Sequence, residues 1–164
     1  DEQFDHGAEV FQHAYGLADV ENNVPCTPQT NFRMASCSKQ FTAFAIMLLV
    51  DRGQLKLTDT LEKFFPGLPE YGKKISVRRL LTHVSGLRPD LDLGMPFEGG
   101  AAEAIRLACE EVPVAAPGER FIYSDIGFFL LGHIVEIVTQ QTLDAFLQAR
   151  AFGPPQPPPQ APQL

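Results

Sequence analysis

Residues 32–43 are Phe-Arg-Met-Ala-Ser-Cys-Ser-Lys-Gln-Phe-Thr-Ala, a stretch that joins a candidate nucleophile to the start of an apolar helix. Ser36 and Lys39 are three residues apart, and residues at that spacing lie on one face of a helix. A serine hydroxyl is a weak nucleophile that a neighbouring base or charge must activate. Exposed N–H groups and the helix dipole favour negative charge at a helix start. Ser-x-x-Lys also occurs by chance as an N-cap serine followed by a solvated lysine, so the surrounding chain must decide.

Two later segments supply further candidate groups. Residues 80–87 are Leu-Leu-Thr-His-Val-Ser-Gly-Leu, and residues 117–125 are Pro-Gly-Glu-Arg-Phe-Ile-Tyr-Ser-Asp. Tyr123 lies 84 residues beyond Lys39, and a tyrosine brought beside the lysine could relay a proton. The three segments resemble the nucleophile, "LLTHTSGL" and "PG..F.YSN" segments of the serine β-lactamase and penicillin-binding-protein superfamily. They occur in family order, and the resemblance covers about residues 7–150.

The branch that the chain resembles holds class C β-lactamases, family VIII carboxylesterases and D-alanyl-D-alanine carboxypeptidases. The resemblance implies two-step acyl transfer, with Ser36 as acylating nucleophile, Lys39 as the activating charge and Tyr123 as general acid/base. Cys37 lies inside the same motif. Because the resemblance assigns the attack to Ser36, Cys37 is interpreted as a small buried residue.

Asp125 departs from the family pattern, which has an asparagine at this substrate-binding position. An asparagine amide can donate a hydrogen bond, whereas a carboxylate can only accept one. A carboxylate beside Lys39 is expected to keep the lysine protonated and so to weaken it as a base. Tyr123 is then the favoured base, and amide substrates become less favourable.

Short-chain carboxylic esters are the first predicted substrates, because they have good leaving groups and need little transition-state help. β-Lactams or D-alanyl peptides come second. The family's third motif, Lys-Thr-Gly or His-x-Gly on a late strand, has no counterpart here, which predicts an N-terminal portion with an incomplete sheet. That strand supplies an oxyanion-hole donor whose loss lowers turnover by about 10²–10³. The alternative is a catalytically inactive fragment that assembles through its open sheet edge.

Composition predicts an ordinary domain with one core, since 45% of the 164 residues are hydrophobic. The net charge of −7 argues against nucleic-acid and anionic-membrane partners. The longest apolar run, residues 44–50, is too short to span a bilayer. The chain opens Asp-Glu-Gln-Phe-Asp with no signal peptide, which leaves bacterial cytoplasm and periplasm both open. The three cysteines lack metal-ligand spacing, so three free thiols are favoured over one disulfide, and neither metal nor cofactor is expected.

The resemblance implies an α+β fold, the mainly helical portion of a β-lactamase-like fold with an incomplete sheet. Residues 8–14 alternate loosely before Gly16, which predicts a small N-terminal antiparallel strand or hairpin. A second copy of the chain is the expected partner for that hairpin, which predicts a homo-oligomer. Helices are expected over residues 37–52, 59–65, 77–83, 101–111, from Asp125 onward, and from Thr142 towards Arg150. The helix after Asp125 is expected to turn one stripe inward, formed by Phe129, Leu130, His133, Ile134, Ile137 and Val138.

The domain is expected to occupy residues 1–152. Residues 153–164 are rich in proline and are predicted to form a disordered, polyproline-like tail. Two histidines resemble catalytic groups. His83 lies near Ser85, yet no G-x-S-x-G elbow surrounds that serine, and the resemblance implies that this segment is a structural turn below the site. His133 is interpreted as a satisfied core histidine.

Overall fold

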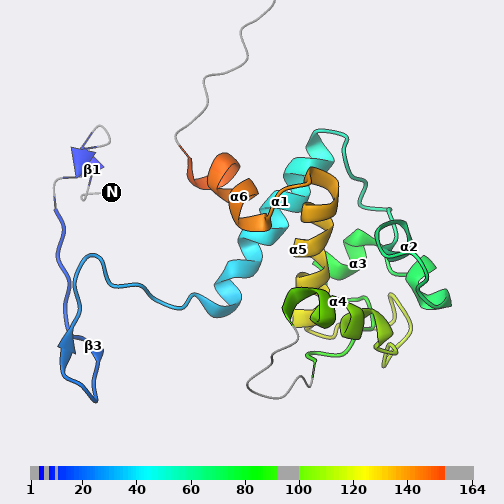
Figure 1. Cartoon of the computed structure of the whole chain (residues 1–164), viewed down its shortest axis with the longest axis horizontal. Helices are drawn as coiled ribbons and strands as arrows, with labels where there is room; N and C mark the ends of the chain where they lie inside the picture. Colours follow the sequence, from blue (N-terminus) through cyan, green and yellow to red (C-terminus); the bar gives the residue numbers. More distant parts are fainter. Residues whose placement is uncertain (1–3, 6–7, 10, 92–99, 154–164) are drawn as a thin grey trace, which may run out of the picture. The chain divides into compact units, whose positions relative to one another are not determined.

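The computed structural model of the protein describes residues 4–5, 8–9, 11–91 and 100–153. Contacts divide the chain into two compact units, Asp1–Ser36 and Cys37–Leu164. The predicted Pro-rich tail lies almost wholly outside the described residues. The N-terminal unit carries the strands, and the C-terminal unit carries most of the helices (Figure 1).

The N-terminal unit contains two short antiparallel pairs. β1 (Phe4–Asp5) pairs with β2 (Ala8–Glu9), and β3 (Leu17–Asp19) pairs with β4 (Val24–Pro25). The predicted α+β class with an antiparallel hairpin is therefore confirmed. The expected strand or hairpin over residues 8–14 is wrong for residues 11–14, which form no strand, and the second hairpin forms further along the chain. Its turn is held by the Asp19 carboxylate, which accepts the Asn22 N–H at 3.0 Å.

The C-terminal unit is a helical assembly in which two long helices contact each other (Figure 1). A 3₁₀ turn, η1 (Ala35–Ser38), leads into the first of them. The helical elements are α1 (Lys39–Asp51), α2 (Leu61–Phe64), η2 (Glu70–Lys73), α3 (Val77–Leu81), α4 (Gly100–Glu110), α5 (Asp125–Thr139), α6 (Leu143–Leu147) and η3 (Gln148–Phe152).

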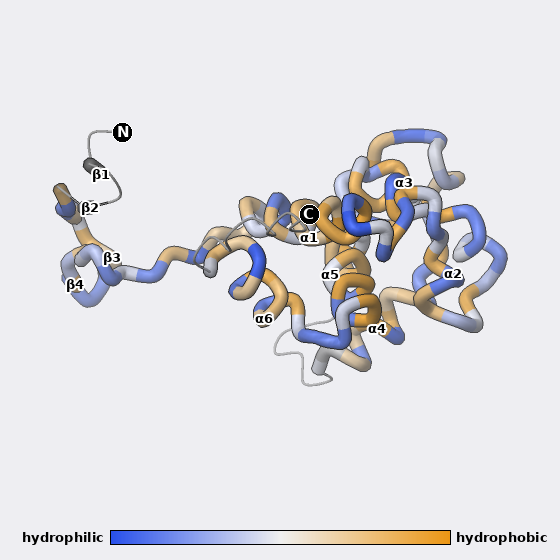
Figure 2. The backbone as a smooth tube through the Cα atoms, turned by 90° about the horizontal axis from the view of Figure 1, so that it is seen from above, coloured by the Kyte–Doolittle hydropathy of each residue, from blue (hydrophilic) through white to orange (hydrophobic). Residues whose placement is uncertain are grey.

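The core of this unit forms where α1 meets α5. Ile46 and Leu49 of α1 are completely buried, as are Leu131 and Ile134 of α5. Burying one such side chain contributes about 1.5–3 kcal/mol. Hydrophobic residues follow α5 along most of its length (Figure 2). The contact between α1 and α5 therefore holds the first turn of one helix near the first turn of the other.

The inward face of α5 is wider than the predicted stripe. Leu130 and Ile134 are buried as expected, but Phe129 is 38% exposed. Ile126, Leu131 and Val135, outside the predicted stripe, are buried instead. The physical reason is that α1, α3, α4 and α6 all contact α5. A helix covered on several sides does not keep one polar face.

The helix starts follow the capping residues of the sequence. Ser76 Oγ accepts the Arg79 N–H at 3.3 Å, and Thr142 Oγ1 accepts the Ala145 N–H at 3.2 Å. Ser124 caps α5, because its Oγ accepts the Gly127 N–H at 3.1 Å. α3 ends two residues before the predicted end at His83. His83 has a φ of +56°, a left-handed conformation that stops the helix.

The segments 83–89 and 114–125 run against each other through main-chain hydrogen bonds. These bonds are Val114 N–H to Gly86 O at 2.9 Å, Gly118 N–H to Val84 O at 2.7 Å, Ile122 N–H to His83 O at 2.8 Å and Asp125 N–H to Pro89 O at 2.7 Å. Gly86 has a φ of +83°, and a Cβ there would lie 2.2 Å from the Ala115 carbonyl oxygen. Only glycine fits this approach. The second and third sequence motifs are thus joined along their lengths.

Within the described residues, no single helix is long and apolar enough to cross a membrane. The consecutive segments Asp125–Thr139 and Leu143–Phe152 have the length and apolar composition of a membrane span only when they are taken together. The angle between them is 74°.

Candidate active site

Lys39 lies at the centre of the candidate site. It begins α1, and its Nζ donates to Oδ1 of Asp125, the first residue of α5, in an ion pair. The same Nζ lies 4.7 Å from the ring centroid of Tyr123 and 5.8 Å from that of Phe128. The Lys39 side chain is 18% exposed, whereas that of Asp125 is 53% exposed. Three of the four predicted site residues therefore meet, although 84 residues separate Lys39 from Tyr123.

The surroundings of Lys39 favour its charged form. Partial burial alone would lower the Lys39 pKa, but the hydrogen bonds with Asp125 and then with Tyr123 outweigh it. The negative charges of these partners act in the same direction, so the Lys39 pKa is raised above its ordinary value. Lys39 is an ammonium at neutral pH, as the sequence predicts from Asp125.

Ser36 lies in η1, the turn that continues directly into α1 at Lys39. The boundary between the two compact units falls immediately after it. Its assignment as the nucleophile stays a prediction that depends on spacing and motif. Cys37, the next residue, is exposed, so its interpretation as a buried residue is wrong. The turn precedes α1 instead of packing as part of it, which leaves the thiol outside the core. All three cysteines are free.

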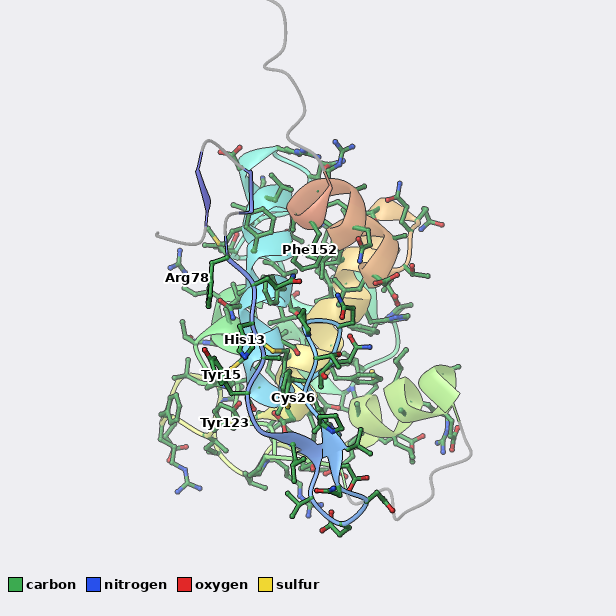
Figure 3. The ribbon with its side chains drawn as sticks, turned by 90° about the vertical axis from the view of Figure 1, so that its left-hand side faces the viewer. His13, Tyr15, Cys26, Arg78, Tyr123 and Phe152 are labelled. Carbon is green, nitrogen blue, oxygen red and sulfur yellow. The ribbon has the colours of Figure 1, made fainter. Side chains whose placement is uncertain are left out.

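Tyr123 (labelled in Figure 3) precedes α5 by two residues and lies in an aromatic cluster. Its ring stacks on His83, with centroids 4.5 Å apart. The His83 ring also contacts Phe121 at 5.5 Å and Phe128 at 5.1 Å. The sequence offers one signal for this cluster. Phe121 and Tyr123 are two residues apart in an extended segment, so they share a face.

His83 and Ser85 do not form a catalytic pair. The Ser85 hydroxyl is buried and accepts the Leu87 N–H at 3.3 Å, which stabilises the turn. The His83 ring instead accepts the Ser124 N–H through Nδ1 at 3.1 Å. Sequence reasoning treated His83 as part of a turn and missed this contact with the Tyr123 segment.

His133 lies in the second half of α5, away from Asp125 at its start. Its Nδ1 is 2.8 Å from Glu136 Oε2, and its ring stacks on Phe65. Its side chain is 31% exposed, so it is half-buried at the edge of the core. Among the residues that the structure describes, no three His, Cys, Asp or Glu side chains gather as they would around a metal ion.

A small hollow borders the Asp125 side of the site. It measures about 230 Å³ and is mostly apolar. Its lining residues are Asp90, Leu91, Ala104, Asp125, Ile126 and Phe129. The arrangement therefore offers an ammonium, a phenol and a carboxylate beside an apolar recess.

Comparison with known proteins identifies the family of the chain. A family model described as Beta-lactamase matches residues 4–156. The chain belongs to the Beta-lactamase family, which confirms the resemblance drawn from the three motifs.

Curated relatives are longer than this chain. Penicillin-binding protein 4* of Bacillus subtilis is 31% identical over 154 residues, which are 88% of this chain and 33% of the relative. The human mitochondrial serine beta-lactamase-like protein LACTB is 39% identical over 112 residues, which are 65% of this chain and 20% of the relative. The chain thus spans about a third or less of the length of these two relatives.

Solved structures resemble this chain in fold. D-amino acid amidase from Ochrobactrum anthropi SV3, complexed with D-phenylalanine, matches with a TM-score of 0.72 and 34% identity over 84% of this chain and 39% of that chain. The octameric penicillin-binding protein homologue from Pyrococcus abyssi matches with a TM-score of 0.74 and 34% identity, covering 89% of this chain and 36% of that chain.

Proposed function

We propose that the protein is a serine hydrolase that cleaves short-chain carboxylic esters through an acyl-Ser36 intermediate. The observation that carries this proposal is the position of Lys39, which contacts Tyr123 and Asp125 from the first turn of α1. Ser36 lies three residues before this lysine, in the turn that leads into the same helix. Membership of the Beta-lactamase family supports the same assignment.

The proposed reaction has two steps. As the Ser36 oxygen bonds to the ester carbonyl carbon, its proton passes to the Tyr123 phenolate, and Tyr123 then protonates the departing alcohol as the ester C–O bond breaks. Water attacks the acyl-serine carbon, again giving a proton to Tyr123, and Ser36 regains that proton when it leaves. Lys39 stays charged and stabilises the phenolate between transfers.

The ester preference depends on Asp125. An asparagine amide could donate a hydrogen bond to the carbonyl group of an amide substrate, but the Asp125 carboxylate cannot. Asp125 also holds Lys39 as an ammonium, which removes the lysine as a proton acceptor. Esters have better leaving groups than amides and need less assistance from either residue.

Amide hydrolysis is the second candidate. The observation that favours it is the likeness to D-amino acid amidase, at 34% identity over most of this chain. β-Lactam or D-alanyl-peptide hydrolysis belongs to the same candidate, because those substrates also carry an acyl group on nitrogen. An inactive fragment that binds another chain is the remaining alternative.

Covalent labelling tests the nucleophile. A fluorophosphonate probe is expected to modify Ser36, and intact mass followed by peptide mapping identifies the labelled side chain. Ser36→Ala should abolish both labelling and p-nitrophenyl acetate hydrolysis. Ser38→Ala, two residues away, is the matched control and should retain both. Label on Ser38, Ser85 or Cys37 with Ser36 unmodified overturns the assignment.

Substrate comparison tests the class. Acetyl and butyryl p-nitrophenyl esters are expected to turn over measurably, while nitrocefin turns over weakly or not at all. Nitrocefin turnover that equals ester turnover contradicts the ester assignment. Absence of any Ser36-dependent turnover favours the inactive fragment.

A further inference from the structure

His83 contacts the Tyr123 segment on both sides of the tyrosine. Its carbonyl oxygen accepts the N–H of Ile122 at 2.8 Å, and its ring Nδ1 accepts the N–H of Ser124 at 3.1 Å. The ring also stacks on the Tyr123 ring itself. One residue therefore fixes the main chain before the tyrosine, the main chain after it, and the plane of its ring.

The Ser124 end of this contact is rigid. Ser124 is only 1% exposed, and its hydroxyl donates to the Arg88 carbonyl oxygen at 2.7 Å while it accepts the Gly127 N–H. The Ser124 hydroxyl is therefore fixed by two hydrogen bonds, and the Ser124 amide N–H donates to the imidazole. The orientation of the peptide after Tyr123 thus depends on a side chain 41 residues earlier in the chain.

We propose that His83 is a positioning residue that holds the Tyr123 phenol beside Lys39 through its Nδ1 contact with Ser124 and its stacking on the tyrosine ring. This inference rests on the proposed role of Tyr123 as general acid/base. It goes beyond the turn-forming role assigned to this segment, because a turn needs only the His83 main chain.

The contact requires neutral imidazole. Nδ1 can accept the Ser124 N–H only when the ring proton is on Nε2, and protonation turns both ring nitrogens into donors. The charged or titratable groups around the ring are Lys39 of α1, Asp125 of α5 and the stacked Tyr123. Burial and then the Lys39 charge lower the His83 pKa, against the opposing effect of Asp125. The ring is therefore neutral at pH 7 and loses the Ser124 contact only in acid.

Two substitutions at His83 distinguish the effect of the aromatic ring from the effect of the hydrogen-bond acceptor. Asn keeps an oxygen near the Nδ1 position and tolerates the left-handed φ of +56°. Phe keeps an aromatic ring but has no acceptor. We expect His83→Phe to lower kcat for p-nitrophenyl acetate by about 10- to 100-fold with little change in KM, because misplacement of a catalytic group by about 1 Å has effects of this size. We expect His83→Asn to recover at least half of that loss on a logarithmic scale.

His133→Asn is the matched control, since His133 is a half-buried histidine of the same unit whose ring contacts Glu136 and Phe65. It should leave kcat within twofold of the unchanged protein. Equal kcat values for the unchanged protein and His83→Phe overturn the proposal. So does a change confined to KM.

The dependence of kcat on pH in acid separates a positioning role from a purely structural one, because a purely structural His83 would not change this dependence. In the unchanged protein, kcat should fall as pH drops through a value below the ordinary histidine pKa of about 6.5. In His83→Asn the contribution of the imidazole to this limb should be lost, because an amide does not titrate, so the midpoint of the limb should move. An acid limb that persists unchanged in His83→Asn contradicts the proposal.

NMR of the unchanged protein tests the contact without any activity measurement. The ring nitrogens of His83 should show the Nε2–H tautomer at pH 7, and the Ser124 amide resonance should shift with the His83 titration. A Nδ1–H tautomer, or a Ser124 amide that ignores the titration, overturns the inference. Absence of Ser36-dependent hydrolysis with the expected NMR result would instead count against the proposed function alone.

Discussion

At the scale of single residues, the pair between Lys39 and Asp125 decides the chemistry that the site can perform. Asp125 holds the ammonium in place, and the ammonium in turn lies over the Tyr123 ring. A protonated lysine cannot accept a proton from a serine. It can stabilise a phenolate, so in the proposed mechanism the proton-accepting role passes to the tyrosine.

Removing the carboxylate should move the alkaline limb of activity. Asp125 raises the Lys39 pKa, so the charged lysine persists beyond its ordinary value of about 10.4. Asp125→Asn lowers the Lys39 pKa, and kcat/KM for p-nitrophenyl acetate should therefore decline at a lower pH than in the unchanged protein. Asp90→Asn changes a second carboxylate of the adjoining hollow and is the control. Identical alkaline limbs in all three proteins would show that the pair does not govern the reaction.

The same substitution should change substrate preference. With an asparagine at position 125, a donor faces the substrate, so activity towards amide-like substrates such as nitrocefin should rise relative to ester activity. The measurement is the ratio of the two kcat/KM values in Asp125→Asn and in the unchanged protein. An unaltered ratio removes Asp125 from the explanation of specificity.

Motif and spacing singled out Lys39, Tyr123 and Asp125, because each belongs to a local pattern around its own position, and the structure brings the three side chains together. Their catalytic roles stay predictions. The role of the His83 ring was not accessible in this way. Its partner Ser124 is 41 residues away, and the bond depends on how two loops approach each other. Exposure of Cys37 was missed for a related reason, since a motif does not tell which side of a turn faces the core.

At the scale of elements, the joined segments 83–89 and 114–125 hold the site. Gly86→Ala should destabilise the protein by more than backbone strain alone, which is about 1–3 kcal/mol for a non-glycine residue at positive φ. The added Cβ would also meet the Ala115 carbonyl oxygen at 2.2 Å. Urea unfolding followed by circular dichroism measures the difference.

Gly53→Ala is the control for this prediction. Gly53 ends α1 with a φ of +69°, and a Cβ there would have no atom within 4 Å. It isolates the strain of the backbone from the clash. Equal loss of stability in the two variants would mean that the close approach at Gly86 relaxes without effect.

Helix positions were largely predictable, because capping residues such as Ser76 and Thr142 act within one turn of themselves. The hairpin lies further along the chain than predicted. The Asp19 carboxylate accepts hydrogen bonds from the backbone and the side chain of Asn22, and the turn that they stabilise fixes the hairpin after Gly16, not among the strand-forming residues before it. The buried face of α5 was underestimated. Four neighbouring helices contact α5 and bury its side chains, and the hydrophobic periodicity of α5 alone does not reveal these neighbours.

At the scale of the whole molecule, we expect a homodimer or larger oligomer. Short strand pairs are marginal in water unless something covers them, and the N-terminal unit exposes apolar side chains around the predicted contact, including 55% of Phe11 and 78% of Tyr15. Light scattering at micromolar concentration should give a mass above the 18.1 kDa of one chain. The octameric Pyrococcus abyssi homologue shows that a protein with this likeness can assemble.

A charge at the expected contact tests which unit assembles. Tyr15→Lys should shift the mass towards 18.1 kDa, whereas Val112→Lys, at a comparably exposed apolar residue of the C-terminal unit, should not. A monomer of unchanged sequence that hydrolyses esters would show that assembly is unnecessary.

The bond between Lys39 and Asp125 joins positions 86 residues apart. Closing a flexible loop of that length opposes folding by about 4 kcal/mol or more, whereas a solvent-accessible ion pair returns about 1 kcal/mol at most. The pair therefore cannot assemble itself, and it forms because the α1–α5 core has already condensed. Ester hydrolysis should consequently disappear in the same denaturant transition as the helical signal. A kinetic assay on this protein would then report, in real time, the arrival of two distant parts of one chain at their native separation.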